Sequence, residues 1–311
     1  MGRRRDQGAG SAGAGRADPW SAFVVAAAAV LFGAVVILGD IIGRQGIPVT
    51  SMLAVRFAVA AAVLAIILAG TGRQLRPAPG EGWRLALLGA AGYALESVLF
   101  FVAIGRGTAA AVTLLFFTYP VWVAVLSVVL GMGRPGWLVG GALAAAVAGA
   151  GLVVASSGGL DITATGIGFA LAAAVAFSGY LVGADLWLKR TSSLAAAMWV
   201  SAAAAAALAT YAAVSGGGRL PPDGPGWLLV TGMGALTAAA FFCLFLGLRR
   251  LGAVRSSIIA ALEPVSTSLL AVWILGERLS EGVVAGGVLI LAGAVAAGIA
   301  RKGPEPQPGA P

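Results

Sequence analysis

The sequence predicts an all-α integral membrane protein of ten transmembrane helices, arranged as two inverted repeats of five helices each. Of its 311 residues, 59% are hydrophobic and 10% are charged, and the mean hydropathy is +0.97. These values are far from the balance of a soluble domain. The second half also repeats the first, since Pro120 and Gly149 recur 144 positions later as Pro264 and Gly293. A duplicated set of membrane spans is typical of proteins that move solutes across a bilayer.

The domain boundaries follow from the apolar runs. We expect a flexible cytoplasmic tail at 1–20, a first repeat at 21–155, a linker at 156–165, a second repeat at 166–300 and a cytoplasmic tail at 301–311. Gly, Pro and charged residues separate continuous apolar runs of about 20 residues, the length of a helix that crosses a bilayer. Barrel strands would instead alternate in polarity. The expected spans are 21–43, 50–70, 83–104, 108–130, 136–155, 166–188, 194–214, 227–248, 253–275 and 281–300.

The distribution of Lys and Arg predicts the orientation. With the amino terminus inside, 15 of the 20 cations fall on the inner side, 4 on the outer side, and Arg56 falls within a span. Positive loops stay in the cytoplasm, so both termini are expected to be cytoplasmic in a multi-pass protein of the cell membrane. Five spans per repeat would place the second copy upside down relative to the first. Inverted bundles can open a shared central site to each side in turn.

Composition also excludes several classes of function. The net charge of +8 is scattered over many short loops, so it predicts contact with lipid rather than with nucleic acid. Cys243 is the only cysteine and the chain has no histidine, so neither a metal site nor a bound cofactor is expected. The sequence has no Walker-type glycine loop either. We therefore expect a protein that is not an enzyme, and whose partners are the bilayer and a small solute.

Two motifs in the second half carry a resemblance to a known family. Glu263 and Pro264 are followed about one helix later by Leu-Gly-Glu-Arg-Leu at 275–279. This half resembles the EamA-type repeat of the drug/metabolite transporter superfamily, and the resemblance covers about residues 21–300. In the first half, Tyr119 precedes Pro120 where Glu-Pro stands later, so the first copy is the more diverged. The resemblance implies a ten-helix carrier, often an exporter of amino acids, metabolites or toxic compounds that uses proton or substrate gradients.

Carboxylates inside the spans are the strongest candidates for a site. An ionised acid near a helix centre costs about 2.5 to 3.5 kcal/mol on insertion scales, so it normally faces a cavity or a partner. Glu96 and Glu263 are the deepest, and each is a candidate for a substrate or proton site, together with Tyr119. The alternative for Glu96 is a neighbouring helix that satisfies its carboxyl group. The alternative for Glu263 is the helix kink at Pro264, whose freed backbone groups its side chain could satisfy; Pro120 is expected to kink the first copy.

Three further charged residues have two interpretations each. Asp40 and Asp185 are related by the repeat, near the distal end of the first span of each copy. They could be matching gates, or interfacial residues whose side chains reach water. Where the family commonly has a Lys in the first span, this chain has Asp40. Arg56 could bind a substrate carboxylate, or pair with Asp40 across the first hairpin.

Together these features predict a secondary active transporter of small organic solutes such as amino acids, metabolites or drugs, exporting them by alternating access. Coupling to protons or to a counter-substrate and assembly into a homo-oligomer both stay open. The alternatives are a sugar-phosphate or nucleotide-sugar antiporter and a lipid-moving or channel-like membrane protein. Several aromatic side chains could line an apolar cavity or face lipid: Phe100, Phe101, Phe116, Phe117, Tyr119, Trp122, Tyr180 and Trp199.

Overall fold

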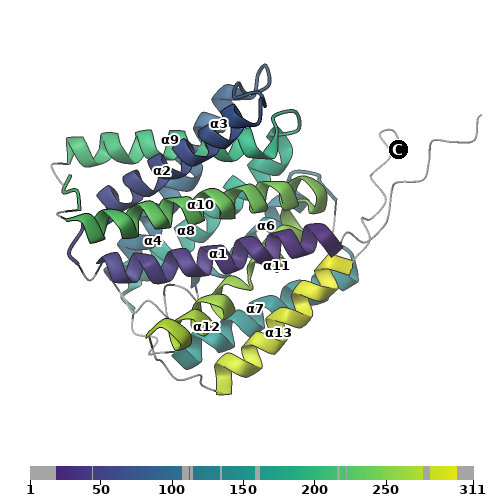
Figure 1. Ribbon diagram of the computed structural model, residues 1–311. Helices are drawn as coiled ribbons and strands as arrows, with labels where there is room; N and C mark the ends of the chain where they lie inside the picture. The colour runs from purple at the N-terminus through teal and green to yellow at the C-terminus, as the bar shows by residue number, and fades with distance from the viewer. Residues whose placement is uncertain are drawn as a thin grey trace, which may run out of the picture.

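The computed structural model describes residues 19–43, 45–106, 112, 115–133, 135–157, 162–215, 218–221, 223–275 and 281–299. This part of the chain is helical and contains no strand, as the sequence predicts (Figure 1). The helices are α1 (Pro19–Gly43), α2 (Val49–Gly70), α3 (Gly82–Leu87), η1 (Leu88–Tyr93), α4 (Ala94–Ile104), α6 (Tyr119–Val129), α7 (Trp137–Ser157), α8 (Ala164–Trp187), α9 (Ser193–Val214), α10 (Gly224–Leu251), α11 (Ala253–Ala260), α12 (Glu263–Leu275) and α13 (Glu281–Ile299).

Six helices in the described part are long and apolar enough to cross a membrane. They are Pro19–Gly43, Val49–Gly70, Gly82–Ile104, Ala164–Trp187, Ser193–Val214 and Gly224–Leu251. Three shorter apolar helices lie at Tyr119–Val129, Trp137–Leu152 and Val284–Ala297. Every expected span therefore contains helix, whereas the number ten stays a prediction. Large apolar side chains such as Trp137 and Trp273 are 89% and 82% exposed, as expected where lipid covers the helices.

Local capping sets where several helices begin. The side chains of Thr163, Ser192 and Asp223 accept hydrogen bonds from backbone amides three residues later and so cap α8, α9 and α10. Each bond satisfies an amide at the helix start that has no partner within the helix. Pro120 and Pro264 each occupy the second position of a helix, α6 and α12, where a missing amide costs little.

The two halves of the chain pack so that helices of one repeat contact helices of the other. Helix α1 packs against α10, and its repeat counterpart α8 packs against η1 and α4, which together with α3 correspond to α10. Likewise α1 contacts α12 as α8 contacts α6, while α2 pairs with α9 and α7 with α13. In Figure 1, α7 and α13 lie together at one edge, and α1, α10, α2 and α9 follow across the front. These contacts of one repeat with the other thus have counterparts, as a pseudo-twofold axis between the repeats would require.

Glycines related by the repeat show this symmetry at atomic detail in the α7–α13 pair. A Cβ atom at Gly149 would lie 2.6 Å from the carbonyl oxygen of Gly286 and 2.9 Å from the amide nitrogen of Ile290. A Cβ atom at Gly293 would lie 2.7 Å from the carbonyl oxygen of Ala142 and 3.2 Å from the amide nitrogen of Ala146. The two sets of partners are themselves 144 positions apart. The recurrence of this glycine is therefore explained by two backbones that approach closely across the axis.

A second glycine pair repeats the arrangement elsewhere. A Cβ atom at Gly89 would lie 2.4 Å from the carbonyl oxygen of Val200 in α9, and one at Gly234 would lie 2.8 Å from the carbonyl oxygen of Arg56 in α2. Val200 stands 144 positions after Arg56, and Gly234 stands 145 positions after Gly89. The same symmetry therefore relates four further helices. It also shows that Arg56 has an apolar counterpart, so the charge it carries breaks the symmetry of the bundle.

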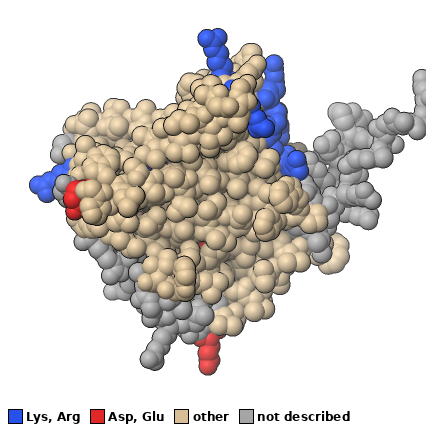
Figure 2. Space-filling view, in the orientation of Figure 1, with Lys and Arg blue, Asp and Glu red and all other residues tan. Residues whose placement is uncertain are grey.

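Most of the described cations gather at one end of the bundle. The start of α1 and the end of α13 lie at the same end in Figure 1, and Figure 2 shows Lys and Arg concentrated towards that side, with broad tan surfaces between the ends. Arg73, Arg76, Lys189, Arg190 and Arg249 belong to the turns and helix ends there. We call this the basic end.

Candidate functional site

Arg56 is buried in the middle of the bundle and is held by a neighbouring helix. Its side chain is 6% exposed, and its Nε donates a 2.7 Å hydrogen bond to Oγ1 of Thr237 in α10. The Thr237 hydroxyl in turn donates to the carbonyl oxygen of Met233 at 2.8 Å. The guanidinium carbon lies 4.8 Å from the centre of the Phe57 ring, a cation–π distance. The sequence also predicts an ion pair between Arg56 and Asp40, but the Asp40 side chain lies outside the described part of the chain.

Glu96 lies within electrostatic reach of this guanidinium, three residues after a π-helical segment ends. The segment η1 interrupts the third span at Leu88–Tyr93, and Glu96 follows in the first turn of α4. Such segments are frequent at functional sites because they turn side chains off the regular helical face. Glu96 is 6% exposed, and its Oε2 accepts a 3.1 Å hydrogen bond from the Ser97 hydroxyl. Arg56 and Glu263 both interact electrostatically with Glu96, so these three charges share one region.

Glu263 approaches the same region from the other repeat. It is the first residue of α12, which starts after a turn at 261–262 that separates it from α11. The bend expected at Pro264 thus takes the form of a break between two helices. Pro120 likewise follows a turn at 117–118 and stands at the start of α6. Glu263 interacts electrostatically with Arg56, and Arg56, Glu96 and Glu263 all act on the buried Tyr93.

Tyr119 joins three helices next to these charges. Its side chain is 1% exposed, and its hydroxyl donates to the carbonyl oxygen of Ser257 in α11 at 3.2 Å. Its own carbonyl accepts a 3.0 Å hydrogen bond from Ser178 in α8. Its ring lies 4.9 Å from that of Phe177. Tyr119 is therefore a buried junction of α6, α8 and α11, with its hydroxyl already bonded.

A chain of aromatic rings connects these residues. Tyr93 lies at its centre, with ring centroids 4.7 Å from Phe241, 5.3 Å from Tyr180, 5.4 Å from Phe57 and 6.0 Å from Phe177. All four contacts are edge-to-face, so the edge of one ring meets the face of the other. The rings come from α2, η1, α8 and α10, so both repeats contribute. We call Arg56, Glu96, Glu263, Tyr93 and Tyr180 with the adjoining rings the central cluster.

Sequence reasoning found the charged members of this cluster and missed several others. Tyr93, Thr237 and Phe241 were not expected to take part, although Tyr93 stands three residues before Glu96, a spacing that places two side chains on one helix face. Trp122 and Trp199, two of the aromatic candidates, are 37% and 39% exposed. Trp199 bonds the carbonyl oxygen of Leu75 at 2.7 Å, so it supports a loop at the surface.

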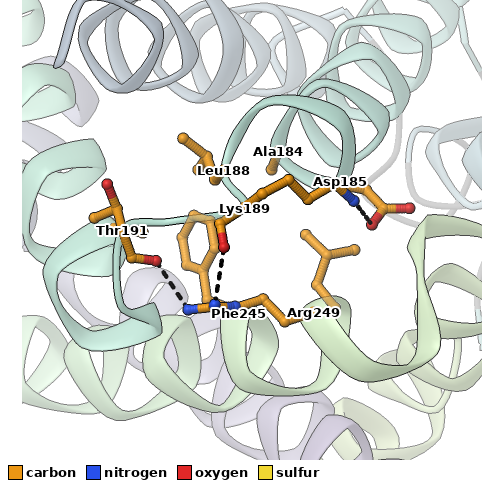
Figure 3. Close-up of a pocket in the computed structure, with 9 residues that line it drawn as sticks. Ala184, Asp185, Leu188, Lys189, Thr191, Phe245 and Arg249 are labelled. Carbon is orange, nitrogen blue, oxygen red and sulfur yellow. Dashed lines mark hydrogen bonds and ion pairs between the residues drawn. The ribbon is translucent and has the colours of Figure 1, made fainter. Parts of the chain in front are cut away.

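Asp185, one of the two gate candidates, lies at the basic end beside a small cavity (Figure 3). Its Oδ1 lies 3.4 Å from the Nζ of Lys189, and its Oδ2 accepts a 3.0 Å hydrogen bond from the amide of Ala253 at the start of α11. Gly252 has a φ of +78°, a conformation that favours glycine, and it presents this amide to Asp185. The other gate candidate, Asp40, lies in α1, and nothing further is described of its side chain.

The cavity has a volume of about 130 Å³, and an arginine closes one wall of it. Figure 3 shows the side chain of Arg249 reaching from α10 to the loop between α8 and α9. Its two terminal nitrogens donate to the carbonyl oxygens of Thr191 and Lys189, at 2.9 and 3.1 Å. The loop after α8 is therefore tied to the end of α10.

Glu81 fixes the same loop from the opposite side. It is 4% exposed and lies just before α3, outside the span. Its carboxylate accepts hydrogen bonds from the amides of Lys189, Arg190 and Thr191 at 3.2, 3.0 and 2.8 Å. Burial alone would raise the pKa of Glu81, but the bonds from the Thr191 side chain and from the three amides outweigh it and hold the pKa below its usual value. We call Glu81, residues 189–191 and Arg249 the basic-end network.

Comparison with known proteins places the chain in a family. The family described as "EamA-like transporter family" matches residues 19–155 and again 164–299. A crystal structure of a protein 22% identical in sequence superimposes with a TM-score of 0.76, covering 89% of this chain and 96% of that one. At that identity the likeness shows the fold alone. No curated protein matches the chain. Among the described residues, no group of three or more His, Cys, Asp or Glu side chains could hold a metal ion.

Proposed function

The chain belongs to the EamA-like transporter family, and from this premise we propose that it is a secondary active transporter that exports small organic solutes by alternating access. The observation that carries the proposal is the central cluster. Arg56, Glu96 and Glu263 are ionisable groups drawn from both repeats of a bundle of apolar helices; Arg56 and Glu96 are buried, and Glu263 is half-buried. Such groups are costly inside a membrane and mark solute and ion pathways.

Alternating access is supported by the exchanged contacts between the two halves. The start of α1 and the end of α8, its repeat counterpart, both lie near the end of α10. Gly247 of α10 contacts Val25 of α1, and Arg249 of α10 donates a hydrogen bond to the loop that follows Trp187 of α8. Repeat-related helices thus run in opposite directions, which is the arrangement of an inverted repeat. We propose ten spans related in this way. Two such halves have two equivalent conformations, one open to each side of the membrane.

The basic-end network supports an assignment of the conformation described here. Glu81 and Arg249 tie the first repeat, the loop after α8 and the end of α10 together at one end. We propose that this end is cytoplasmic and closed, and that Asp185 and Asp40 act as gates at opposite ends. The breaks at Pro120 and Pro264 then allow the short helices α6 and α12 to tilt while the glycine-packed pair α7–α13 stays fixed.

Transport is tested with the purified chain in sealed vesicles. Vesicles loaded with amino acids, amines and other metabolites should release one class of solute in a saturable way, faster when a proton gradient or a counter-solute is imposed. Glu96→Gln should remove the effect of the gradient if Glu96 carries the coupling proton. Vesicles that retain every solute while the protein scrambles fluorescent lipids would overturn the carrier proposal and support the lipid-moving alternative.

Orientation is tested by labelling at the two ends. In a chain with Cys243 replaced by Ser, a single cysteine at Arg73 should resist a membrane-impermeant maleimide in intact cells and react after lysis. A single cysteine at Arg219 should react in intact cells. The reverse pattern would overturn the cytoplasmic assignment of the basic end and leave the fold unaffected.

A further inference from the structure

The central cluster carries an excess of acidic groups and a set of ring faces, and we infer that it recognises an organic cation, an amine or ammonium group attached to an apolar body. The inference rests on the proposed function and names the class of solute that the proposed carrier takes. It is carried by three observations about the cluster: its charge balance, its rings and one unpartnered hydroxyl.

The charge balance favours a positive ligand. The charged groups that act on Tyr93 are one guanidinium, Arg56, and two carboxyl groups, Glu96 and Glu263. The guanidinium is already engaged, since its Nε bonds Thr237 and its carbon lies over Phe57. Glu96 receives only the Ser97 hydroxyl among its described hydrogen-bond partners. With both carboxyl groups ionised, the region carries one net negative charge, which an anion would increase and a monovalent cation would neutralise.

The rings favour a cation over a neutral solute. A cation within about 6 Å of a ring centre is attracted by the negative face of the ring. Tyr93 and Phe241 lie nearly perpendicular, at 87°, as do Tyr119 and Phe177, at 85°. Faces and edges therefore alternate along the cluster. Tyr93 interacts electrostatically with both carboxyl groups, so a cation bound beside it would lie near a ring and a carboxylate together.

The hydroxyl of Tyr180 supplies the third observation. Tyr180 is 2% exposed, and its hydroxyl has no hydrogen-bond partner among the described residues. A buried polar group without a partner is costly and calls for an explanation. The Tyr180 ring stacks 5.8 Å from Phe177 and meets Tyr93 at 5.3 Å, so the hydroxyl belongs to the central cluster. A substrate with an N–H group would give this oxygen a donor.

Binding to the purified full-length chain in detergent tests the inference with four matched solutes. Titration calorimetry should detect 2-phenylethylamine, which is positive at pH 7, and no comparable binding of the neutral 2-phenylethanol, the anionic 3-phenylpropionate or the zwitterionic phenylalanine. This comparison needs no variant. Equal binding of the amine and the alcohol, or preference for phenylalanine, would overturn the inference.

Three variants locate the binding. Glu96→Gln should weaken the amine about 10- to 100-fold, whereas Glu281→Gln, the same change at the exposed start of α13, should have no effect. Tyr93→Leu should weaken the amine about 2- to 30-fold and Tyr93→Phe much less. Tyr180→Phe should weaken 2-phenylethylamine about 2- to 10-fold and leave benzyltrimethylammonium, which has no N–H, unchanged. Full amine affinity in Glu96→Gln and Tyr93→Leu alike would overturn the location.

Transport separates this inference from the proposed function. Vesicles containing the protein should exchange benzyltrimethylammonium, which does not cross bilayers unaided. Exchange of phenylalanine without exchange of this cation would overturn the inference while the carrier function stands. Failure to move any solute of any charge, with no calorimetric signal, would overturn both.

Discussion

Replacing Gly149 by Ala should destabilise the protein, because the new methyl group meets backbone. The added Cβ would lie 2.6 Å from the carbonyl oxygen of Gly286, 2.8 Å from Cγ1 of Ile290 and 2.9 Å from its amide nitrogen. Ordinary contact begins near 3.4 Å. Helices α7 and α13 must therefore separate by roughly 0.8 Å at this crossing, a gap that forfeits about a quarter to a half of each dispersion contact it opens.

The control lies in the same helix. A Cβ atom at Gly140 in α7 would meet nothing within 4 Å, so Gly140→Ala should gain the helix propensity of Ala, up to about 1 kcal/mol. Overpacking at Gly149 costs about 1 to 3 kcal/mol, and the gain in helix propensity is common to both variants, so they should differ by about 1 to 3 kcal/mol in free energy of unfolding. The assay is reversible unfolding in mixed micelles, followed by circular dichroism. Equal stability of the two variants would refute the close approach at Gly149.

The other predictions concern the symmetry, the basic-end network and Arg56. Gly293→Ala should lower the free energy of unfolding by about as much as Gly149→Ala. The double variant should lose less than the sum of the two, because one separation of the helices relieves both contacts. Additive losses of unfolding free energy would count against a shared crossing. Glu81→Gln should cost about 1 to 3 kcal/mol of stability at pH 7. Because folding lowers the pKa of Glu81, the stabilisation by its carboxylate is complete above the usual pKa of 4.5 and is lost as pH falls through the lowered pKa. The stabilities of wild type and variant should therefore converge in acid. A constant difference in stability from pH 7 to pH 3 would contradict this. Thr237→Val should cost about 1 to 3 kcal/mol in thermal unfolding, since it removes the acceptor of the buried Arg56 Nε. Its control is Thr231→Val, at a half-buried position of the same helix where the hydroxyl bonds only carbonyl oxygens of that helix. Equal stability of the two variants would mean that Arg56 finds another acceptor.

Part of the candidate site could be read from the sequence because charge is rare in these spans. Glu96, Glu263 and Arg56 stand out in apolar runs, and a buried charge needs a partner wherever the helix lies. The partners themselves could not be read. Thr237 lies 181 positions after Arg56, and the three amides bound by Glu81 lie more than 100 positions after it. Nothing in the local sequence relates such distant residues.

The sequence by itself determined the class, the duplication and the candidate charges. Hydropathy alone identifies spans, since a helix in lipid must satisfy its own backbone and cover itself with apolar groups. For the same reason it leaves the contacts undetermined: a helix that is apolar on every side shows no preferred face for packing. Only the tertiary structure decided that Gly149 faces Gly286, that Tyr93 lies at the centre of the rings, and that Glu96 and Glu263, from opposite repeats, lie within electrostatic reach of each other. In a membrane, lipid already covers apolar surface, so burial of that surface does not determine which helices pack together. Close approach of the backbones at small residues does.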